Sequence, residues 1–330
     1  MIFDCFTFFN ELDLLEIRLN TLKDVVDCFV IAEATRTHRG KPKELYFEKN
    51  RARYAKFLNR IRYVVVDDLL PEEEVERDVY NLPWVNENRQ RNAISKGLEG
   101  LRDDDIIMLS DLDEIPRPLA IKDALPIAKN GDAVRFLMEM YCYYANYKDF
   151  CNPIWSLGTV MLSGCTWRTS PAFDSFKCDR FTVASENNGR TMQKIRFLNP
   201  SIKIRHGGWH MSYLGGVQAI MQKLRAFAHV EASSVAKHVE GRIQSGKSIF
   251  GGRRDQFVVP LNEDFPSWLV GNKDRFAHLI FPYDEARDKK YWWWRMCARV
   301  RGICHRMVVA LIPRPFFDLA VRIWHRIRYR

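Results

Sequence analysis

The chain has 330 residues, 47% of them hydrophobic and 28% charged, which is typical of a folded globular protein and excludes a disordered one. Its length is sufficient for a sizeable core. The formal net charge of +10 is concentrated at one end, because residues 288–330 hold 11 Lys and Arg against two Asp and Glu. We therefore expect an anionic partner for this tail alone.

The first third of the chain alternates apolar runs of strand length with segments of helical periodicity. The predicted elements are, in chain order, strand 1–9, helix 10–26, strand 27–34, a loop, strand 60–68, an acidic helix start or solvated face at 71–78, helix 86–101, and a strand with its exit loop at 104–116. This order is typical of an α/β unit with a mainly parallel sheet.

The pattern changes after residue 116. The elements predicted there are a short helix 117–130, an aromatic strand 133–147, a strand running into a glycine-rich turn at 202–216, a helix 217–239, and a basic, aromatic tail 291–330. No Pro/Ser-rich linker interrupts this region. We therefore expect one domain over residues 1–287 and an appendage over residues 288–330.

Targeting signals and cysteine pairs are not evident in the sequence. Met1 leads straight into an apolar strand, and no apolar run approaches the roughly 20 residues that span a bilayer. The eight cysteines form no CxxC pair, and several lie in apolar runs typical of buried thiols. We expect a reduced, cytoplasmic protein with no signal peptide or transmembrane helix.

The segment "IIMLSDLDEIP", residues 106–116, carries the strongest chemical signal. Carboxylates that follow a buried strand lie at the edge where open α/β sheets bind ligands. In a continued strand, Asp111 and Asp113 would face one side with Leu112 in the core, and they would repel each other unless a cation intervened. Mg²⁺ or Mn²⁺ typically binds one or two carboxylates plus substrate phosphates. The alternative is a solvated turn in which Asp caps a helix.

Several separated segments resemble one enzyme family. "DLDEIP" resembles the DxD motif of nucleotide-sugar-dependent glycosyltransferases, and the opening segment "FDCFTFFNELDLLEIRLN" resembles glycosyltransferase family 17. Further similar segments are "ENRQRNAI", "SGCTWR", "HGGWHMSYLGG" and "NKDRFAHLIFP". The resemblance covers about residues 2–283.

The resemblance implies a GT-A-type, Rossmann-like mixed sheet flanked by helices, which would make residues 1–287 a glycosyltransferase domain. It also implies a UDP-sugar donor, UDP-GlcNAc in characterised members, and inversion at the anomeric carbon. Mn²⁺ or Mg²⁺ would bridge Asp113, and Asp111 beside it, to the donor diphosphate. Inversion needs a carboxylate base, for which the sequence leaves Glu114, Glu139 and Asp255 as candidates.

Other residues are weaker candidates, each with a structural alternative. His210 could be a third cation ligand or a hydrogen-bonded turn residue, and Trp209 could stack on a sugar or pack in the core. Arg91 and Asn92 could contact the nucleotide or form a solvated helix face. Glu33 ends a strand where uridine could bind. A basic, glycine-rich loop with Arg253 and Arg254 could close over the donor or be an ordinary surface loop.

The tail is expected to form membrane-surface helices. A helix from Phe316 would carry an apolar, Trp-bearing face and an Arg-rich face, as interfacial helices on anionic membranes do. Packing against the body is the alternative, and we expect no nucleic-acid partner. The enzyme would then lie on the cytoplasmic, inner face of a membrane, and its acceptor would be a glycan or a lipid-linked saccharide.

Two other functions are compatible with the motif. A DxDx motif after an apolar strand also occurs in haloacid-dehalogenase-type phosphatases, where it normally lies near the start of the domain. Here about 110 residues precede it. The other alternative is a non-catalytic sugar-binding or membrane-scaffolding protein. UDP release on adding donor and metal would distinguish the transferase from both.

Overall fold

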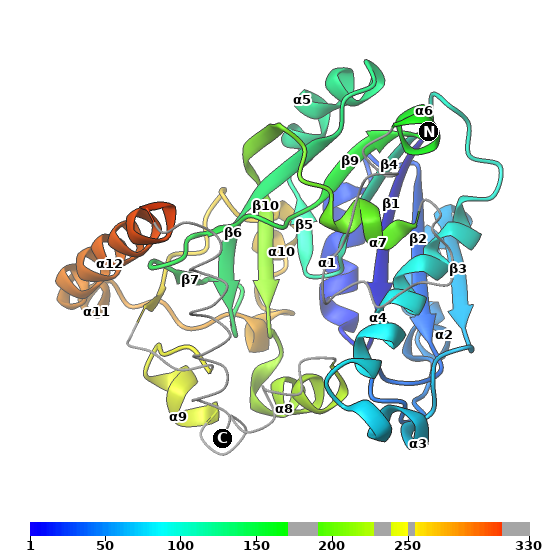
Figure 1. Ribbon diagram of the computed structural model, residues 1–330. Coiled ribbons are helices and arrows are strands. Elements are labelled where there is room, and N and C mark those ends of the chain that lie inside the picture. The colour runs from blue at the N-terminus through cyan, green and yellow to red at the C-terminus, as the bar shows by residue number, and fades with distance from the viewer. Residues whose placement is uncertain (171–190, 228–238, 250–254, 312–330) are drawn as a thin grey trace.

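The computed structural model describes residues 1–170, 191–227, 239–249 and 255–311 (Figure 1). A mixed, mostly parallel β-sheet runs through the molecule with helices on both faces. The predicted α/β class is therefore confirmed, and the arrangement is Rossmann-like.

The strands agree with the predicted apolar runs at most positions. They are β1 (Ile2–Phe8), β2 (Cys28–Ala34), β3 (Ile61–Val66), β4 (Ile106–Asp111), β5 (Glu114–Pro116), β6 (Val134–Cys142), β7 (Tyr147–Asp149), β8 (Ile154–Trp155), β9 (Val160–Ser163), β10 (Ile202–Ser212) and β11 (Gln256–Val258). β1 pairs in parallel with β2 and with β4, and β2 pairs in parallel with β3. This block is the parallel unit that the sequence predicts.

The α-helices are α1 (Leu12–Leu22), α2 (Tyr46–Lys49), α3 (Glu72–Val75), α4 (Leu82–Asn92), α5 (Pro118–Lys129), α6 (Gly164–Thr169), α7 (Met192–Phe197), α8 (Gly216–Ala226), α9 (Val239–Gln244), α10 (Ser267–Gly271), α11 (Glu285–Lys290) and α12 (Trp292–Leu311). The 3₁₀ helices of the described ranges are η1 (Arg51–Arg60), η2 (Glu76–Asp78), η3 (Ala93–Leu98) and η6 (Ala277–Leu279). The predicted helix 86–101 is thus α4 followed by η3.

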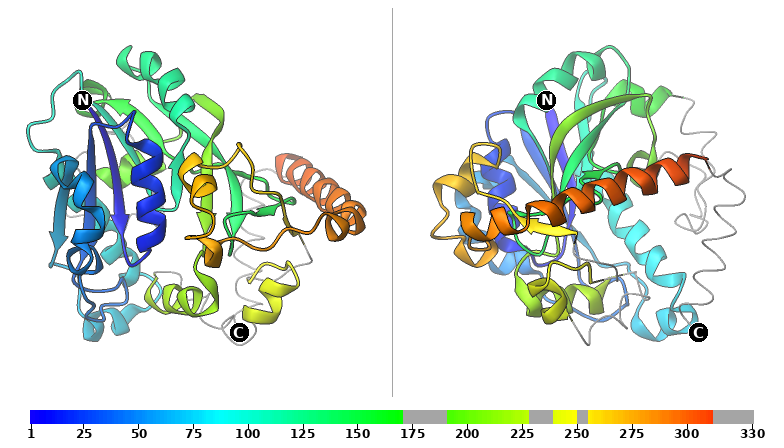
Figure 2. Two further views of the ribbon diagram at one scale, coloured as in Figure 1. Left: turned by 180° about the vertical axis from the view of Figure 1, so that it is seen from behind. Right: turned by 90° about the vertical axis from the view of Figure 1, so that its left-hand side faces the viewer.

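The two largest apolar clusters of the described residues lie on opposite faces of the sheet. The larger one contains the leucines of α1, Ala124 and Ala128 of α5 and Leu269 of α10, while the other contains Ile94 of η3 and Ile195 of α7. The two directions of view in Figures 1 and 2 show α1 on one face and α4 and α7 on the other. β2 is buried along its whole length, as expected for a strand covered on both faces.

β10 brings His210 next to the DLDE segment. It runs parallel to β6 and antiparallel to β5, and its register places His210 opposite Glu114. Gly215 and Gly216 then adopt positive φ angles of 102° and 79°, which glycine tolerates without a Cβ clash. This turn directs α8 back toward the carboxyl ends of the strands.

Some predictions fall on residues outside the described ranges. They concern the helix from Phe316, the loop with Arg253 and Arg254, and part of the helix predicted over 217–239, whose first half is α8. The chain that the structure describes contains no helix with the length and apolar character needed to cross a membrane.

Candidate active site

A cavity of about 500 Å³ opens at the carboxyl ends of the parallel strands. Its walls come from the ends of β1, β4, β6 and β10, from α4 and α8, and from the loop after β2. Open α/β sheets bind ligands at this edge, and the volume is that of a small-molecule site. The charged side chains that line it are Arg36, Lys43, Arg91, Lys223, Glu11, Glu87, Asp111 and Asp113.

The DLDE segment turns within the cavity wall and does not continue as one strand. β4 ends at Asp111, Leu112 and Asp113 form a turn, and β5 begins at Glu114. The buried Arg18 of α1 explains the turn, because its Nη1 donates to the carbonyl oxygens of Asp111 and Leu112 at 3.1 Å and of Glu114 at 2.8 Å. The expected strand geometry is therefore wrong, although Leu112 does pack in the core.

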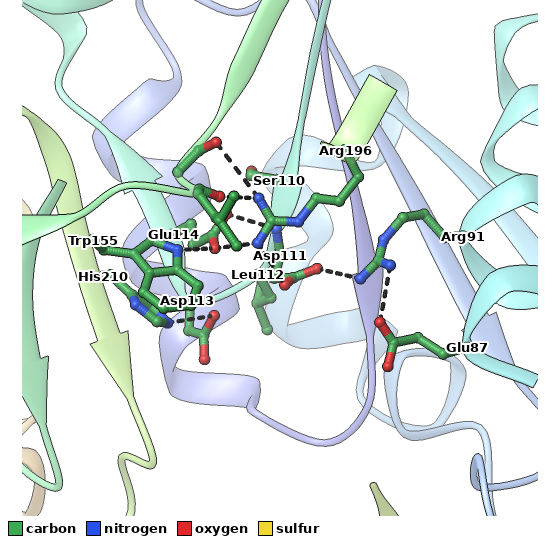
Figure 3. Close-up of polar contacts among 12 residues, drawn as sticks. Glu87, Arg91, Ser110, Asp111, Leu112, Asp113, Glu114, Trp155, Arg196 and His210 are labelled. Carbon is green, nitrogen blue, oxygen red and sulfur yellow. Dashed lines mark hydrogen bonds and ion pairs between the residues drawn. The ribbon is translucent and has the colours of Figure 1, made fainter. Parts of the chain in front are cut away.

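Asp111 is held between two guanidinium groups. Arg91 donates to its Oδ1 at 2.8 Å, and Arg196 of α7 lies 3.1 Å from its Oδ2 (Figure 3). Burial would raise the pKa of Asp111, but the positive charges of Arg196 and Arg91 outweigh burial and hold the pKa well below its usual range. Asp111 therefore stays ionised without a bound cation.

Asp113 also has basic neighbours. His210 Nε2 lies 3.6 Å from its Oδ1, and Lys223 Nζ lies 3.1 Å from its Oδ2. Burial opposes ionisation, but the charges of Lys223 and His210 lower the pKa of Asp113 well below its usual range. Lys223 is also 3.2 Å from Glu11 Oε1. The repulsion between the two aspartates is thus offset by the chain's own basic groups.

Glu114 lies behind the cavity wall and holds the turn. Its Oε1 accepts hydrogen bonds from Trp155 Nε1 and from Arg196, both at 2.6 Å, and its Oε2 accepts one from the backbone N–H of Asp111 at 3.2 Å. Burial raises the pKa of Glu114 despite the nearby Arg196. Trp155 in turn packs against His210, with ring centroids 4.6 Å apart and the two rings tilted by 41° (Figure 3). Glu114 therefore joins the turn to β8 and α7.

The remaining sequence candidates for nucleotide binding are divided between cavity and core. Arg91 lines the cavity, whereas Asn92 accepts a hydrogen bond from the backbone N–H of Gln193 at 3.1 Å and does not line it. Glu33 is fully buried and does not line the cavity itself. Its carboxylate accepts hydrogen bonds from Lys43 Nζ at 2.9 Å and from the backbone N–H of Tyr46 at 2.6 Å.

Trp209, Glu139 and Asp255 lie outside the cavity walls described here. Trp209 alternates with His210 along β10 and packs in the larger core, with the guanidinium of Arg117 4.1 Å from its ring. Glu139 forms an ion pair with Arg117 at 2.8 Å. Asp255 forms an ion pair with Arg301 of α12.

Several important side chains were not identified from sequence. Arg18, Arg196, Lys223 and Trp155 all contact the DLDE turn or its neighbours. A charged residue inside the apolar repeat of α1 could have indicated Arg18, since a buried arginine needs several acceptors. The other three come from distant parts of the chain and carry no local pattern.

The residues allow a divalent cation at Asp113 only together with further ligands. In the described ranges, no three His, Cys, Asp or Glu side chains gather closely enough to hold a metal by themselves. Asp113 and His210 line open cavity space, and His210 Nδ1 is buried with no hydrogen-bond partner. One carboxylate with substrate phosphates is an ordinary Mg²⁺ ligand set, so the donor chemistry fits.

Comparison with known proteins agrees with the resemblance found in the sequence. The model of glycosyltransferase family 17 matches residues 1–154. The β-1,4-mannosyl-glycoprotein 4-β-N-acetylglucosaminyltransferase of Homo sapiens is 25% identical over 313 residues, which cover 87% of this chain and 56% of the human protein. The Rattus norvegicus protein of the same name is 24% identical over 306 residues, covering 84% and 54%.

The chain spans about half the length of the curated relatives it matches. The matched region contains β1 to β6 and the whole DLDE turn, and so includes one side of the cavity. These matches confirm the predicted resemblance to glycosyltransferase family 17, and the relatives matched are named as N-acetylglucosaminyltransferases.

Proposed function

We propose that this protein is an inverting glycosyltransferase that moves GlcNAc from UDP-GlcNAc to a glycan or a lipid-linked saccharide. The observation that carries the proposal is the cavity at the strand ends, where basic side chains surround the DLDE turn. A nucleotide diphosphate is an anionic ligand of suitable size for this cavity. The relatives named above are N-acetylglucosaminyltransferases, which favours this donor, and a GT-A-type fold is part of the same proposal.

The DLDE turn is the proposed diphosphate end of the site. Asp113, with Asp111 and His210 beside it, would hold Mn²⁺ or Mg²⁺, and that ion would neutralise charge on the departing UDP. Arg91 is already fixed by Asp111 and by Glu87 at 2.9 Å, so its guanidinium is oriented at the cavity wall before a ligand arrives. Orientation of this kind lowers the cost of binding phosphate.

The base that deprotonates the acceptor must reach the cavity. Glu114, Glu139 and Asp255 remain candidates from the sequence, but none of the three lines the cavity in the described chain. Two other carboxylates outside the DxD pair do line it, namely Glu11 and Glu87. We place the base among the carboxylates with cavity access, since proton transfer requires hydrogen-bond reach.

The C-terminal part of the described chain has a second proposed role, in binding a membrane. One face of α12 docks on the body through Ala298, which is buried in a small apolar cluster with Phe150 and Phe257, and through the ion pair of Arg301 with Asp255. The other face exposes Trp293, Val300, Ile303 and Met307, which are 50–65% accessible and follow helical spacing. Figure 2 shows α12 projecting along the outside of the molecule.

An anionic lipid surface is the occupant that fits this face. α12 contains four arginines and no acidic residue, and the tail from residue 288 is strongly basic. Apolar and Trp side chains next to arginines suit the interface of an anionic leaflet. The proposed location is the cytoplasmic face, where a lipid-linked acceptor would be available.

A donor screen tests the main proposal. Purified protein is incubated with each UDP-sugar and Mn²⁺, and release of UDP is measured with and without saccharide acceptors. We expect UDP release with UDP-GlcNAc and its loss in Asp113→Asn that is still folded by circular dichroism. Release of phosphate from phosphomonoesters would instead favour the phosphatase. Absence of both turnover and UDP binding would favour the non-catalytic protein.

A further inference from the structure

Lys223 occupies a cation position inside the cavity. Its Nζ lies 3.1 Å from Asp113 Oδ2 and 3.2 Å from Glu11 Oε1, so the ammonium bridges carboxylates from the ends of two neighbouring strands. The side chain is only 11% exposed, and the rings of Phe227 and Tyr213 lie 4.9 and 5.6 Å from Nζ. The ammonium is thus enclosed between two carboxylates and two aromatic rings.

Arg91 and Lys43, two other basic residues of the cavity, pair with other carboxylates. Arg91 contacts Asp111 and Glu87, and Lys43 contacts Glu33 at 2.9 Å. Lys223 is the lysine that contacts Asp113, the aspartate proposed to bind the divalent cation. An ammonium and a divalent ion on one carboxylate would lie within a few Å of each other, where repulsion in a poorly hydrated site is strong.

We propose that Lys223 is an exchangeable cation that neutralises Asp113 before the donor binds and yields this place to the metal–nucleotide complex. Glu11 retains the ammonium during the exchange, which leaves it beside the incoming diphosphate. A lysine suits this role because its flexible stem moves a compact charge by rotamer changes alone. This inference rests on the proposed function, since it assigns a role to a residue of the same site.

The exchange couples metal binding to nucleotide binding. A divalent ion alone must displace Lys223 without compensation, so its affinity is low. When the diphosphate arrives with the ion, the displaced ammonium gains a new anionic contact. Each ligand therefore raises the affinity of the other by the same factor, as linkage requires.

The test measures Mn²⁺ binding to the full chain by electron paramagnetic resonance of free Mn²⁺, with and without UDP. Wild type should bind Mn²⁺ weakly alone and at least about tenfold more tightly with UDP. In Lys223→Met and Lys223→Gln, Mn²⁺ alone should bind about tenfold more tightly, and the factor by which UDP strengthens Mn²⁺ binding should fall correspondingly but stay above one, because the phosphates still bind the ion. Two different substitutions of Lys223 are used so that the test still works if one of the variants does not fold.

Lys43→Met is the matched control. It removes a lysine from the same cavity, but one that pairs with Glu33 and not with Asp113. Its Mn²⁺ affinity should stay within about twofold of wild type, since only long-range charge changes. If the Lys223 variants bind Mn²⁺ and UDP as wild type does, the exchange is wrong while the proposed function stands. If wild type binds no UDP with or without Mn²⁺, the proposed function itself fails.

Discussion

Arg18 and Asp4 form a fully buried, bidentate ion pair beneath the DLDE turn. Arg18 Nε lies 2.8 Å from Asp4 Oδ2, and its Nη2 lies 2.6 Å from Oδ1. The remaining donors bind Ser110 Oγ at 2.7 Å and the three carbonyl oxygens of the turn. Asp4 of β1 and Arg18 of α1 thus fix the shape of a turn that lies 93 to 96 residues after Arg18.

Loss of this arginine should destabilise the protein strongly. Arg18→Met leaves Asp4 buried without its counter-charge, and such changes typically cost about 3–5 kcal/mol. Urea unfolding would measure the free-energy change. The control is Arg102→Met, which removes an exposed arginine 3.2 Å from Asp105 and should cost at most about 1 kcal/mol. Equal effects of the two substitutions would contradict the role assigned to Arg18.

The parallel block of the fold was predictable because its signal is local. β1, β2 and β4 are apolar runs of strand length bounded by charge, and the predicted ranges overlap the observed strands. The position of Asp111 and Asp113 at a ligand-binding edge follows from the same pattern. The turn at Leu112 was not predictable in this way, because a guanidinium from α1 determines it and no local propensity indicates it.

The balance of charge in the site could also not be predicted from the sequence. Two aspartates two residues apart suggested a missing cation, yet Arg91, Arg196 and Lys223 already surround them. These residues lie 20 to 110 positions away from the aspartates that they contact. Trp209 was a candidate for stacking on a sugar, but alternation along β10 turns it into the core, and Trp155 packs against His210 instead.

Acid should lower the unfolding free energy of the wild type more than that of Asp113→Asn. Burial opposes ionisation of Asp113, but Lys223 and His210 keep its folded pKa below the unfolded value near 3.9. The resulting stability is complete above about pH 5 and is lost as the pH falls below about 4. The difference in unfolding free energy between wild type and variant should therefore shrink by at least about 1 kcal/mol from pH 6 to pH 3.

Urea titrations at both pH values measure this change. Asp104→Asn, at an exposed carboxylate, is the control and should give the same difference from wild type at either pH. A pH-independent difference for Asp113→Asn would show that its charge does not stabilise the fold.

Substitution of carboxylates should locate the acceptor base. Loss of a general base typically lowers the rate about 10²–10⁴-fold. We expect such a loss in kcat from Glu11→Gln or Glu87→Gln, which line the cavity, and less than about a tenfold change from Glu139→Gln or Asp255→Asn. Steady-state kinetics with saturating UDP-GlcNAc provide the measurement. If only Glu139→Gln or Asp255→Asn caused a large loss of kcat, the substituted residue would be the base, as the sequence suggested.

The exposed face of α12 should determine membrane binding. Trp293→Glu with Val300→Glu places two carboxylates in the apolar strip without touching Ala298 or the ion pair of Arg301 with Asp255. We expect wild type to sediment with phosphatidylserine-containing vesicles and the double variant to remain in the supernatant, because charged residues at an interface oppose insertion and repel an anionic leaflet. Binding of wild type should also weaken at high salt.

Leu119→Glu is the matched control for this experiment, since Leu119 is an equally exposed apolar residue, at 68%, on the distant helix α5. It should sediment with vesicles as wild type does. Equal sedimentation of the α12 double variant and wild type would exclude this face as the lipid contact. A different outcome is that wild type does not bind vesicles and elutes as a dimer, whereas the double variant elutes as a monomer. This result would show that the apolar strip is an interface with a second copy of the chain.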